Sequence, residues 1–393
     1  MTEDREFYKM RQRLLSCSRY SRVSAMYRLT SLRLTVFITF SVLTATSVDS
    51  LGQESERRRP SEDRLEQLLR RFPDADANQD DKLTPEEARE YREKRRRARD
   101  TNAGRNNQQG PKPTRSDVAY GPHDRNVLDL YLANSQSPTP LIVYVHGGGF
   151  VGGNKNSISP VMINAAHRNG ISVAALHYRF VNGDDVLFPA PQHDCARAIQ
   201  FLRSKADQWN LDPQRFACYG DSAGAGISMW LGFHNDLAQP ESDDPIARQS
   251  TRIVAIGTMG GQGTYDPIKI KDLIGGRAWE HPSILKVYGL KSAENALHPS
   301  KDLQSLYDEA SAITHLTADD PPLFMVYSEP DIVPPPESRP GQFIHHPNFG
   351  KQLKTKMDKL GIENIYVHTP EAKGRNLEME MFEFFKKHFK MMD

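Results

Sequence analysis

The chain has 393 residues, of which 38% are hydrophobic and 26% are charged, so it has enough apolar side chains to bury a folded core. Its 51 lysines and arginines nearly balance its 50 aspartates and glutamates, and this balance argues against a nucleic-acid partner. Three cysteines are too few for a disulfide scaffold, and none of them has the spacing of a zinc motif.

Residues 1–50 have the pattern of an export signal. Eight lysines and arginines lie between Arg5 and Arg33, the apolar run Leu34–Leu43 follows, and small residues come after it. This order is typical of a secretory signal peptide, with Met26 as an alternative start. We therefore expect an exported protein, periplasmic or secreted, with no membrane span after signal removal. The alternative is an uncleaved membrane anchor, although the run is shorter than the roughly 20 residues of a spanning helix.

Residues 51–100 contain a pattern of oxygen-bearing side chains that resembles a single EF-hand. The expected calcium ligands follow the spacing of that loop: Asp76, Asn78, Asp80, Lys82 through its backbone carbonyl, Thr84 and Glu87. Asp81 stands where the loop normally has glycine, so we expect weak Ca²⁺ binding. The alternative is an acidic loop that caps a helix, with Thr84 as the N-cap and Glu87 three residues later.

Residues 101–115 are polar and read as a flexible linker, and residues 116–393 alternate strand-like with helix-like segments. The strand-like runs are short and rich in β-branched and aromatic residues: 141–145, 171–176, 215–219, 253–256 and 323–327. Helical patterns such as Asp194–Arg203 separate them. This alternation predicts an α/β domain with a mainly parallel central sheet and helices on both faces, whose site lies beyond the carboxyl ends of the strands.

One of these strands runs directly into the sequence Gly220-Asp-Ser-Ala-Gly224, and a helical pattern follows it. This is the G-x-S-x-G motif in the strand–turn–helix context that the motif requires. The sharp turn needs small neighbours, because the flanking chain segments pass close together. The turn aims Ser222 outward at a helix N-terminus, where the partial positive charge favours a developing anion.

A second motif, His146-Gly-Gly-Gly-Phe150, follows the strand-like run 141–145. Three consecutive glycines leave backbone N–H groups unshielded, and the oxyanion of an acyl-transfer reaction needs such fixed donors. A phosphate-binding loop is disfavoured, because neither a complete P-loop motif nor a complete G-x-G-x-x-G fingerprint follows. We expect His146 to organise the loop rather than to act as a base.

Together these motifs resemble the hormone-sensitive-lipase-like branch of the α/β-hydrolases, which includes bacterial carboxylesterases and feruloyl-esterase-like hydrolases. The matching segments occur in the family's order: His146–Gly153, His177–Arg179, Phe188–Pro191, Asp212–Arg215 and Gly220–Gly224. The resemblance covers residues 116–393 and implies that Ser222 is the nucleophile. It also implies oxyanion donors at the backbone N–H groups of Gly148, Gly149 and Ala223, carboxylic esters as substrates, and no cofactor for hydrolysis.

The remaining members of the catalytic triad are harder to assign. Asp331, after the strand-like run 323–327, matches the position of the family's acid, and Glu329 is a close competitor. The family's histidine belongs in the loop before the final helix, but residues 369–376 contain none. Arg375 stands near that point and cannot act as a base, because arginine keeps its proton at working pH.

Three possibilities therefore stay open for the general base. His368 ends the last strand, several residues before the usual position. The pair His345–His346 follows the segment of Asp331 and can fold over the site, with His346 as the named alternative. The third possibility is that no base exists.

The sequence thus predicts an exported serine carboxylesterase or lipase-like hydrolase that acts on a small-molecule ester through an acyl-serine. In this prediction Ser222, Asp331 and His368 form the triad. The alternative is a catalytically degenerate α/β-hydrolase that serves as a binding protein, because the loop before the final helix has no Gly-His.

Overall fold

The computed structural model describes residues 65, 69, 75, 82–91, 93 and 110–391. Its contacts divide the chain into two units, residues 1–101 and 102–393, which are described separately here. The predicted export signal, the ligands Asp76, Asn78 and Asp80 and most of the predicted linker lie outside the described residues. Within the described part of the chain, no helix combines the length and the hydropathy needed to cross a membrane.

The described residues of the first unit include a small apolar cluster and the helical residues 85–91. The cluster is formed by Leu65, Ala75, Leu83 and Ala88, with Leu69 and Tyr91 packed against it. At the start of the helix, the backbone N–H of Thr84 donates to Glu87 Oε2 at 3.0 Å, and the N–H of Glu87 donates to Thr84 Oγ1 at 3.2 Å. This reciprocal pair is a capping box, which is the alternative that the sequence offered for this loop. The calcium site stays a prediction.

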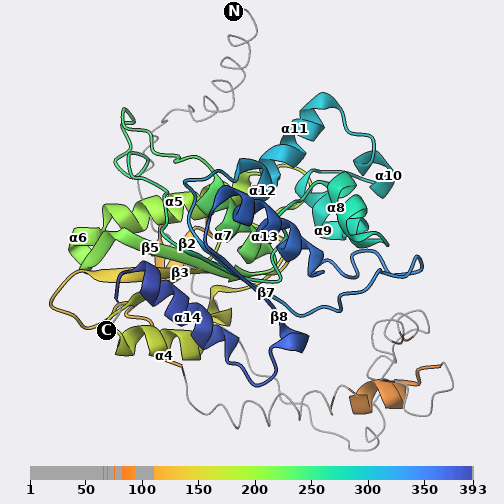
Figure 1. Ribbon diagram of the computed structural model, residues 1–393, viewed down its shortest axis with the longest axis horizontal. Helices are drawn as coiled ribbons and strands as arrows, with labels where there is room; N and C mark the ends of the chain where they lie inside the picture. The colour runs from red at the N-terminus through yellow and green to blue at the C-terminus, as the bar shows by residue number, and fades with distance from the viewer. Residues whose placement is uncertain are drawn as a thin grey trace, which may run out of the picture. The chain divides into compact units, whose positions relative to one another are not determined.

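The second unit is built on one eight-stranded sheet in the order β1-β2-β4-β3-β5-β6-β7-β8 (Figure 1). The strands are β1 Arg115–Ala119, β2 Val127–Tyr131, β3 Thr139–Val145, β4 Ser172–Leu176, β5 Leu211–Asp221, β6 Ile256–Met259, β7 Leu323–Tyr327 and β8 Asn364–His368. Strand β2 is antiparallel to both β1 and β4. All other neighbours are parallel, so the strands from β4 to β8 end at the same edge of the sheet.

Helices cover both faces of the sheet. The helices are α4 Pro160–Arg168, α5 Ala190–Ser204, α6 Ala206–Trp209, α7 Ala223–Phe233, α8 Pro267–Ile274, α9 Pro282–Val287, α10 Ala293–Ala296, α11 Lys301–Ala310, α12 Ala312–His315, α13 Asn348–Leu360 and α14 Leu377–His388. Short 3-10 turns occur at Lys155–Ser157, Ala278–Glu280 and Thr369–Glu371. Helices α5, α7 and α13 pack on one face, and α4 and α14 pack on the other (Figure 1). Helices α8 to α12 all lie between β6 and β7 in the chain.

Strand β3 illustrates how the sequence supplies both cores. Leu141, Val143 and Val145 belong to the core under α5, α7 and α13, whereas Ile142 and Tyr144 belong to the core under α4 and α14. Side chains alternate along a strand, so a run of apolar residues faces both ways and needs cover on both faces. Each residue of β3 is buried, as expected for a central parallel strand.

The α/β-hydrolase fold predicted from the sequence is confirmed, including the mainly parallel sheet and the helices on both faces. The bounds of one predicted strand differ: the run 253–256 overlaps β6 only at Ile256, where that strand begins. Ile253 and Ala255 are buried. Hydrogen bonds to β5 already occur in this run, because the N–H of Val254 donates to the carbonyl of Phe216 at 2.8 Å, whereas the pairing to β7 starts at Ile256. The antiparallel strands β1 and β2 were not predicted.

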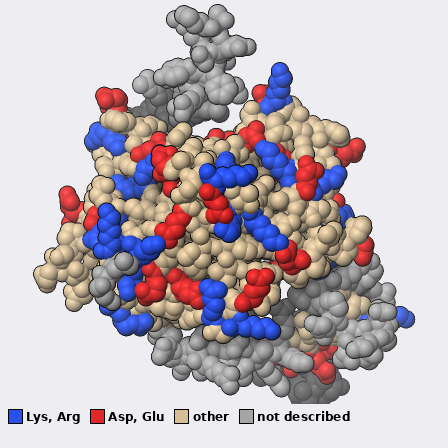
Figure 2. Space-filling model, viewed as in Figure 1, with Lys and Arg blue, Asp and Glu red and all other residues tan. Residues whose placement is uncertain are grey.

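The surface carries both signs of charge. On the face in Figure 2, basic and acidic side chains are interspersed over the second unit rather than gathered into one area. Several charged side chains of the second unit form ion pairs within one helix or between neighbouring elements, including Lys354–Asp358 at 2.9 Å and Lys387–Glu363 at 2.6 Å. This arrangement matches the net charge of +1.

Candidate active site

The turn between β5 and α7 holds Ser222 in a strained backbone conformation. Its φ is +50° and its ψ is −117°, in a region that residues other than glycine rarely adopt. Gly220 and Gly224 both face the carbonyl oxygen of Val145, and a Cβ on either glycine would collide with it. The N–H of Ser222 donates to the carbonyl of Met259 at 2.8 Å, which ties the turn to β6. The backbone thus has the geometry of a nucleophile elbow.

The glycine loop after β3 lies against the same turn. Gly148 has a φ of +114° and Gly149 a φ of +60°, so both use conformations that favour glycine. Gly148, Gly149 and Ala223 line one cavity together with Ser222. The structure therefore brings together the three residues expected to supply oxyanion donors and the residue expected to be the nucleophile.

His146 lies beneath this loop and is 1% exposed. Its ring stacks on Tyr178 at a centroid distance of 4.4 Å, and its Nδ1 lies 2.7 Å from the carbonyl oxygen of Gly147. The hydroxyl of Tyr178 donates to the carbonyl of His146 at 2.9 Å. Burial lowers the pKa of His146, which favours the neutral ring. These contacts hold the shape of the loop.

A histidine from the segment between β7 and α13 contacts the serine. Nε2 of His345 lies 2.8 Å from Ser222 Oγ. On the other side of the ring, Nδ1 lies 3.5 Å from Glu329 Oε1, and the backbone N–H of His345 donates to Glu329 Oε2 at 3.0 Å. Gly260, with a φ of +61°, packs so closely that a Cβ there would lie 3.1 Å from His345 Cδ2. A serine, a histidine and a carboxylate are thus aligned.

The other acidic and histidine candidates have different partners. Asp331 forms an ion pair with Lys351, and this ammonium group lowers the pKa of Asp331. Nε2 of His368 lies 2.9 Å from the carbonyl oxygen of Glu329. His346 is 2% exposed, and its Nε2 lies 2.9 Å from the carbonyl oxygen of Ile332. Within the described residues, Ser222 is therefore brought together with His345 and Glu329, not with Asp331, His368 or His346.

The histidine that contacts Ser222 lies in another part of the chain than the sequence pattern predicts. The expected position was the loop after β8, whereas His345 lies between β7 and α13, after the prolines at 334–336. The pair His345–His346 was the named alternative, with the second member preferred. The available signal was the absence of a histidine in residues 369–376 together with a pair of histidines, His345 and His346, earlier in the chain.

The cavity at Ser222 has a volume of about 250 Å³. Its walls come from the glycine loop, from the serine turn, from the segment between β6 and α9 together with the start of α9, and from the segment before α13. The lining residues are Gly148, Gly149, Phe150, Ser222, Ala223, Gln262, Tyr265, His281, Ser283, Ile284, Ile344 and His345. The amide of Gln262 donates to the carbonyls of Gly260 and Ile344 at 3.0 and 2.9 Å, which links two of the walls. The cavity is small and has both polar and apolar walls.

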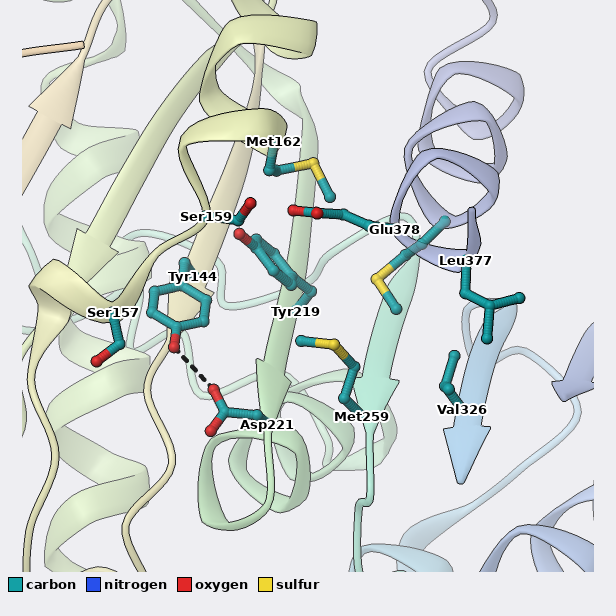
Figure 3. A pocket seen from close by; sticks show the side chains of 11 residues that line it. Tyr144, Ser157, Ser159, Met162, Tyr219, Asp221, Met259, Val326, Leu377 and Glu378 are labelled. Carbon is teal, nitrogen blue, oxygen red and sulfur yellow. Dashed lines mark hydrogen bonds between the residues drawn. The ribbon is translucent and has the colours of Figure 1, made fainter. Parts of the chain in front are cut away.

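A second cavity, of about 270 Å³, lies behind the turn under α4 and α14 (Figure 3). Asp221, the residue before Ser222, faces it, and the hydroxyl of Tyr144 donates to Asp221 Oδ1 at 2.7 Å. Burial, with the nearby Asp221 carboxylate, raises the pKa of Tyr144, so the phenol remains a proton donor. The hydroxyl of Tyr219 lines the same cavity and is buried without a hydrogen-bond partner. The serine turn is thus braced from β3.

The fold and the serine turn define an α/β-hydrolase. The sequence profile of the BD-FAE family matches residues 128–340, which is more than half of the chain, and the chain belongs to that family.

Individual relatives are similar at lower coverage. The chain is 28% identical over 230 residues to the probable carboxylic ester hydrolase LipM of Mycobacterium tuberculosis, which covers 57% of this chain and 49% of that protein. The chain spans about half the length of the curated relatives it matches.

Two solved structures share the fold. The acetyl ester-xyloside bifunctional hydrolase from Caldicellulosiruptor lactoaceticus has a TM-score of 0.56 at 18% identity, covering 73% of this chain and 100% of that one. Thermogutta terrifontis esterase 2 phosphonylated by sarin has a TM-score of 0.52 at 20% identity, covering 70% of this chain and 96% of that one.

Proposed function

We propose that the protein is a serine ester hydrolase that cleaves carboxylic esters through an acyl intermediate on Ser222. The observation that carries this proposal is the distance of 2.8 Å between His345 Nε2 and Ser222 Oγ. A nucleophilic serine needs a base within hydrogen-bond reach, and this contact supplies one. The relatives support the reaction class, since LipM is described as a probable carboxylic ester hydrolase.

The roles of the three residues follow from their contacts. With the Nδ1 proton of His345 directed at Glu329, the lone pair of Nε2 faces the hydroxyl of Ser222. His345 takes the serine proton as Oγ attacks the ester carbonyl, and it then gives that proton to the departing alcohol. A water molecule then attacks the acyl-serine, with His345 again as the base, and the carboxylic acid is released from Ser222. Glu329 orients the ring and stabilises the imidazolium that forms.

The negative charge of the tetrahedral intermediate needs donors beside the serine. The backbone N–H groups of Gly148, Gly149 and Ala223 are the proposed donors, because these residues line the cavity that contains Ser222. Ala223 is also the first residue of α7, where the partial positive charge of the helix stabilises an anion.

The size of the cavity favours small acyl groups. A volume of about 250 Å³ is near the lower end for ligand pockets, and Phe150, Ile284 and Ile344 supply apolar walls. The fold neighbour from Caldicellulosiruptor lactoaceticus is described as an acetyl ester-xyloside bifunctional hydrolase, and an acetyl ester has a short acyl chain. We place the acyl group, rather than a long alcohol, in this space.

The alternative of a degenerate hydrolase loses its main support. It rested on the missing histidine in residues 369–376, and His345 offers a base from another segment.

Export through residues 1–50 and Ca²⁺ binding through Asp76 to Glu87 complete the proposal, on the sequence pattern alone. If Ca²⁺ binds, millimolar metal raises the Tm of the full chain and Glu87→Gln removes this rise.

A fluorophosphonate probe tests the proposed nucleophile. The purified full chain should be labelled at Ser222 and should hydrolyse a short-chain aryl ester. Ser222→Ala should abolish both, whereas Ser283→Ala, which alters the other serine of the cavity, should keep the labelling. A folded protein that neither reacts with the probe nor hydrolyses the ester would contradict the proposal and favour a binding role.

A further inference from the structure

Three side chains that can bind a metal ion meet at the far end of α7. His234 is the C-cap of this helix, Glu309 lies in α11 and His315 is the last residue of α12. One ligand atom from each lies within 4.8 Å of the others. Nε2 of His234 is 3.0 Å from Glu309 Oε1, and Nε2 of His315 is 3.8 Å from Glu309 Oε2. This is the one such cluster among the described residues.

The surroundings of His234 call for a positive charge at this point. Its Nδ1 lies 2.9 Å from the carbonyl oxygen of Asn235, and its Nε2 faces the carboxylate of Glu309. A neutral imidazole has only one N–H. In one of these two contacts, a lone pair of the ring nitrogen would therefore face a lone pair of the acceptor oxygen, which is repulsive. A second proton or a bound cation removes that conflict. The carbonyl groups at the C-terminal end of α7 also favour a cation there.

The cluster is partly buried and well supported. The side chains of His234 and His315 are 17% and 18% exposed, and that of Glu309 is 39% exposed, so a hydrated ion can reach them. The ring of Trp230 lies over His234 at a centroid distance of 4.3 Å. The contact from His234 Nδ1 to a backbone carbonyl is the outer contact that commonly fixes a metal-binding histidine.

We propose that His234, Glu309 and His315 form a zinc site that joins the C-terminal end of α7 to the α11–α12 segment. Two imidazoles and one carboxylate with an open position for water are a ligand set that Zn²⁺ accepts in tetrahedral geometry. Zinc–ligand bonds of about 2.0–2.1 Å place ligand atoms roughly 3.4 Å apart. The 3.0 Å separation of His234 from Glu309 Oε1 is close to this value, whereas His315, which lies 3.8 Å from the other carboxylate oxygen, must move to bind the same ion.

That movement leaves the backbone carbonyl of Glu309 with a partner. Nε2 of His315 now lies 2.9 Å from the carbonyl oxygen of Glu309 and must turn away to bind the ion. The same carbonyl also accepts a hydrogen bond from Trp230 Nε1 at 3.0 Å, which remains. The ion therefore replaces one hydrogen bond of His315 without exposing a buried carbonyl.

The site does not take part in the proposed hydrolysis. The whole length of α7 separates it from Ser222, and 11 helical residues at about 1.5 Å each span roughly 16 Å. Its effect is on stability, because an ion that binds only the folded chain raises the free energy of unfolding. It fixes the end of the helix that begins at the serine turn.

Zinc titration of the EDTA-treated full chain tests the site. We expect one Zn²⁺ per chain by calorimetry, a Tm that rises with zinc concentration, and the visible absorption of tetrahedral Co²⁺ when cobalt is substituted. Glu309→Gln and His315→Gln should each weaken binding at least tenfold and remove the cobalt spectrum. His298→Gln, at an exposed histidine outside the cluster, should change neither.

Two results would overturn the proposal. One is the absence of a bound ion at tens of micromolar free zinc, with a Tm that responds to pH alone, which would mean an ion pair of His234 and Glu309. The other is binding of equal affinity in the parent chain and in both cluster variants, which would place the zinc elsewhere. Two cluster variants are used so that a folding defect in one leaves the other as a test.

Discussion

The two halves of the candidate active site are held in different ways. The half with Ser222, Gly148 and Gly149 is fixed by backbone: strand ends, positive φ angles and glycines packed against carbonyl oxygens. The half with Glu329 and His345 is held mainly by side-chain contacts on the segment between β7 and α13, and these two side chains are 26% and 35% exposed. The position of Ser222 and of the glycine loop is thus fixed by the backbone, whereas the position of Glu329 and His345 depends on a few contacts near the surface.

The largest expected effect comes from the side-chain half. His345→Ala removes the proposed base, and kcat for a short-chain aryl ester should fall about 10⁴-fold or more, as for other triads. His368→Gln is the matched control, because glutamine keeps an N–H donor for the carbonyl of Glu329, and it should change kcat only a few-fold. Steady-state kinetics of both variants decide between the two histidines. If His368→Gln is the inactive one, our assignment fails.

The next effect tests the backbone half. Gly149→Ala adds a Cβ at a φ of +60° and drives it against Ser283 Oγ, so the N–H of residue 149 moves. We expect kcat to fall about 10²–10³-fold, which is the effect of losing one oxyanion donor. Gly152→Ala is the control in the same loop, because its Cβ would meet only Gly148 O at an ordinary 3.7 Å. Equal losses in both variants would indicate general disruption of the loop.

A smaller effect is expected from the acid. Glu329→Gln keeps the shape of the side chain but removes its charge, and kcat should fall about 10²-fold, because the 3.5 Å contact with His345 is long and partly exposed. Asp331→Asn breaks only the surface ion pair with Lys351 and should leave kcat within about twofold. Kinetics over a range of pH values measure both. The reverse order would restore Asp331 as the acid.

The same contrast explains what the sequence could predict. The serine turn and the glycine loop are each formed by consecutive residues, Gly220 to Gly224 and Gly147 to Gly149. Their geometry can therefore be predicted from a short stretch of sequence. The mainly parallel sheet with helices on both faces also follows from strand–helix alternation, whereas the order of the strands was not predicted. Glu329 and His345 are 16 residues apart and meet Ser222 only after the sheet has formed. No sequence spacing predicts this contact, so the proposed roles of Glu329 and His345 follow only from the folded structure.

The smallest expected effect concerns two tyrosines behind the serine turn, which differ in whether their hydroxyl groups form a hydrogen bond. Tyr144 and Tyr219 are neighbours on β3 and β5, with ring centroids 5.0 Å apart, and both face the cavity in Figure 3. The hydroxyl of Tyr144 donates to Asp221, whereas that of Tyr219 has no partner. Tyr144→Phe should therefore lower the free energy of unfolding by about 1.5 kcal/mol, the usual value for a hydrogen bond to a charged group.

Tyr219→Phe should have the opposite sign or no effect, because it removes a buried hydroxyl that gains nothing from the fold. Urea unfolding of both variants measures their free energies of unfolding, which can then be compared with each other and with the parent. If the backbone alone fixes the serine turn, kcat of Tyr144→Phe stays within a few-fold of the parent while its stability drops. A large loss of kcat at unchanged KM would mean instead that the backbone half of the site also depends on one side-chain contact, through Asp221 next to Ser222.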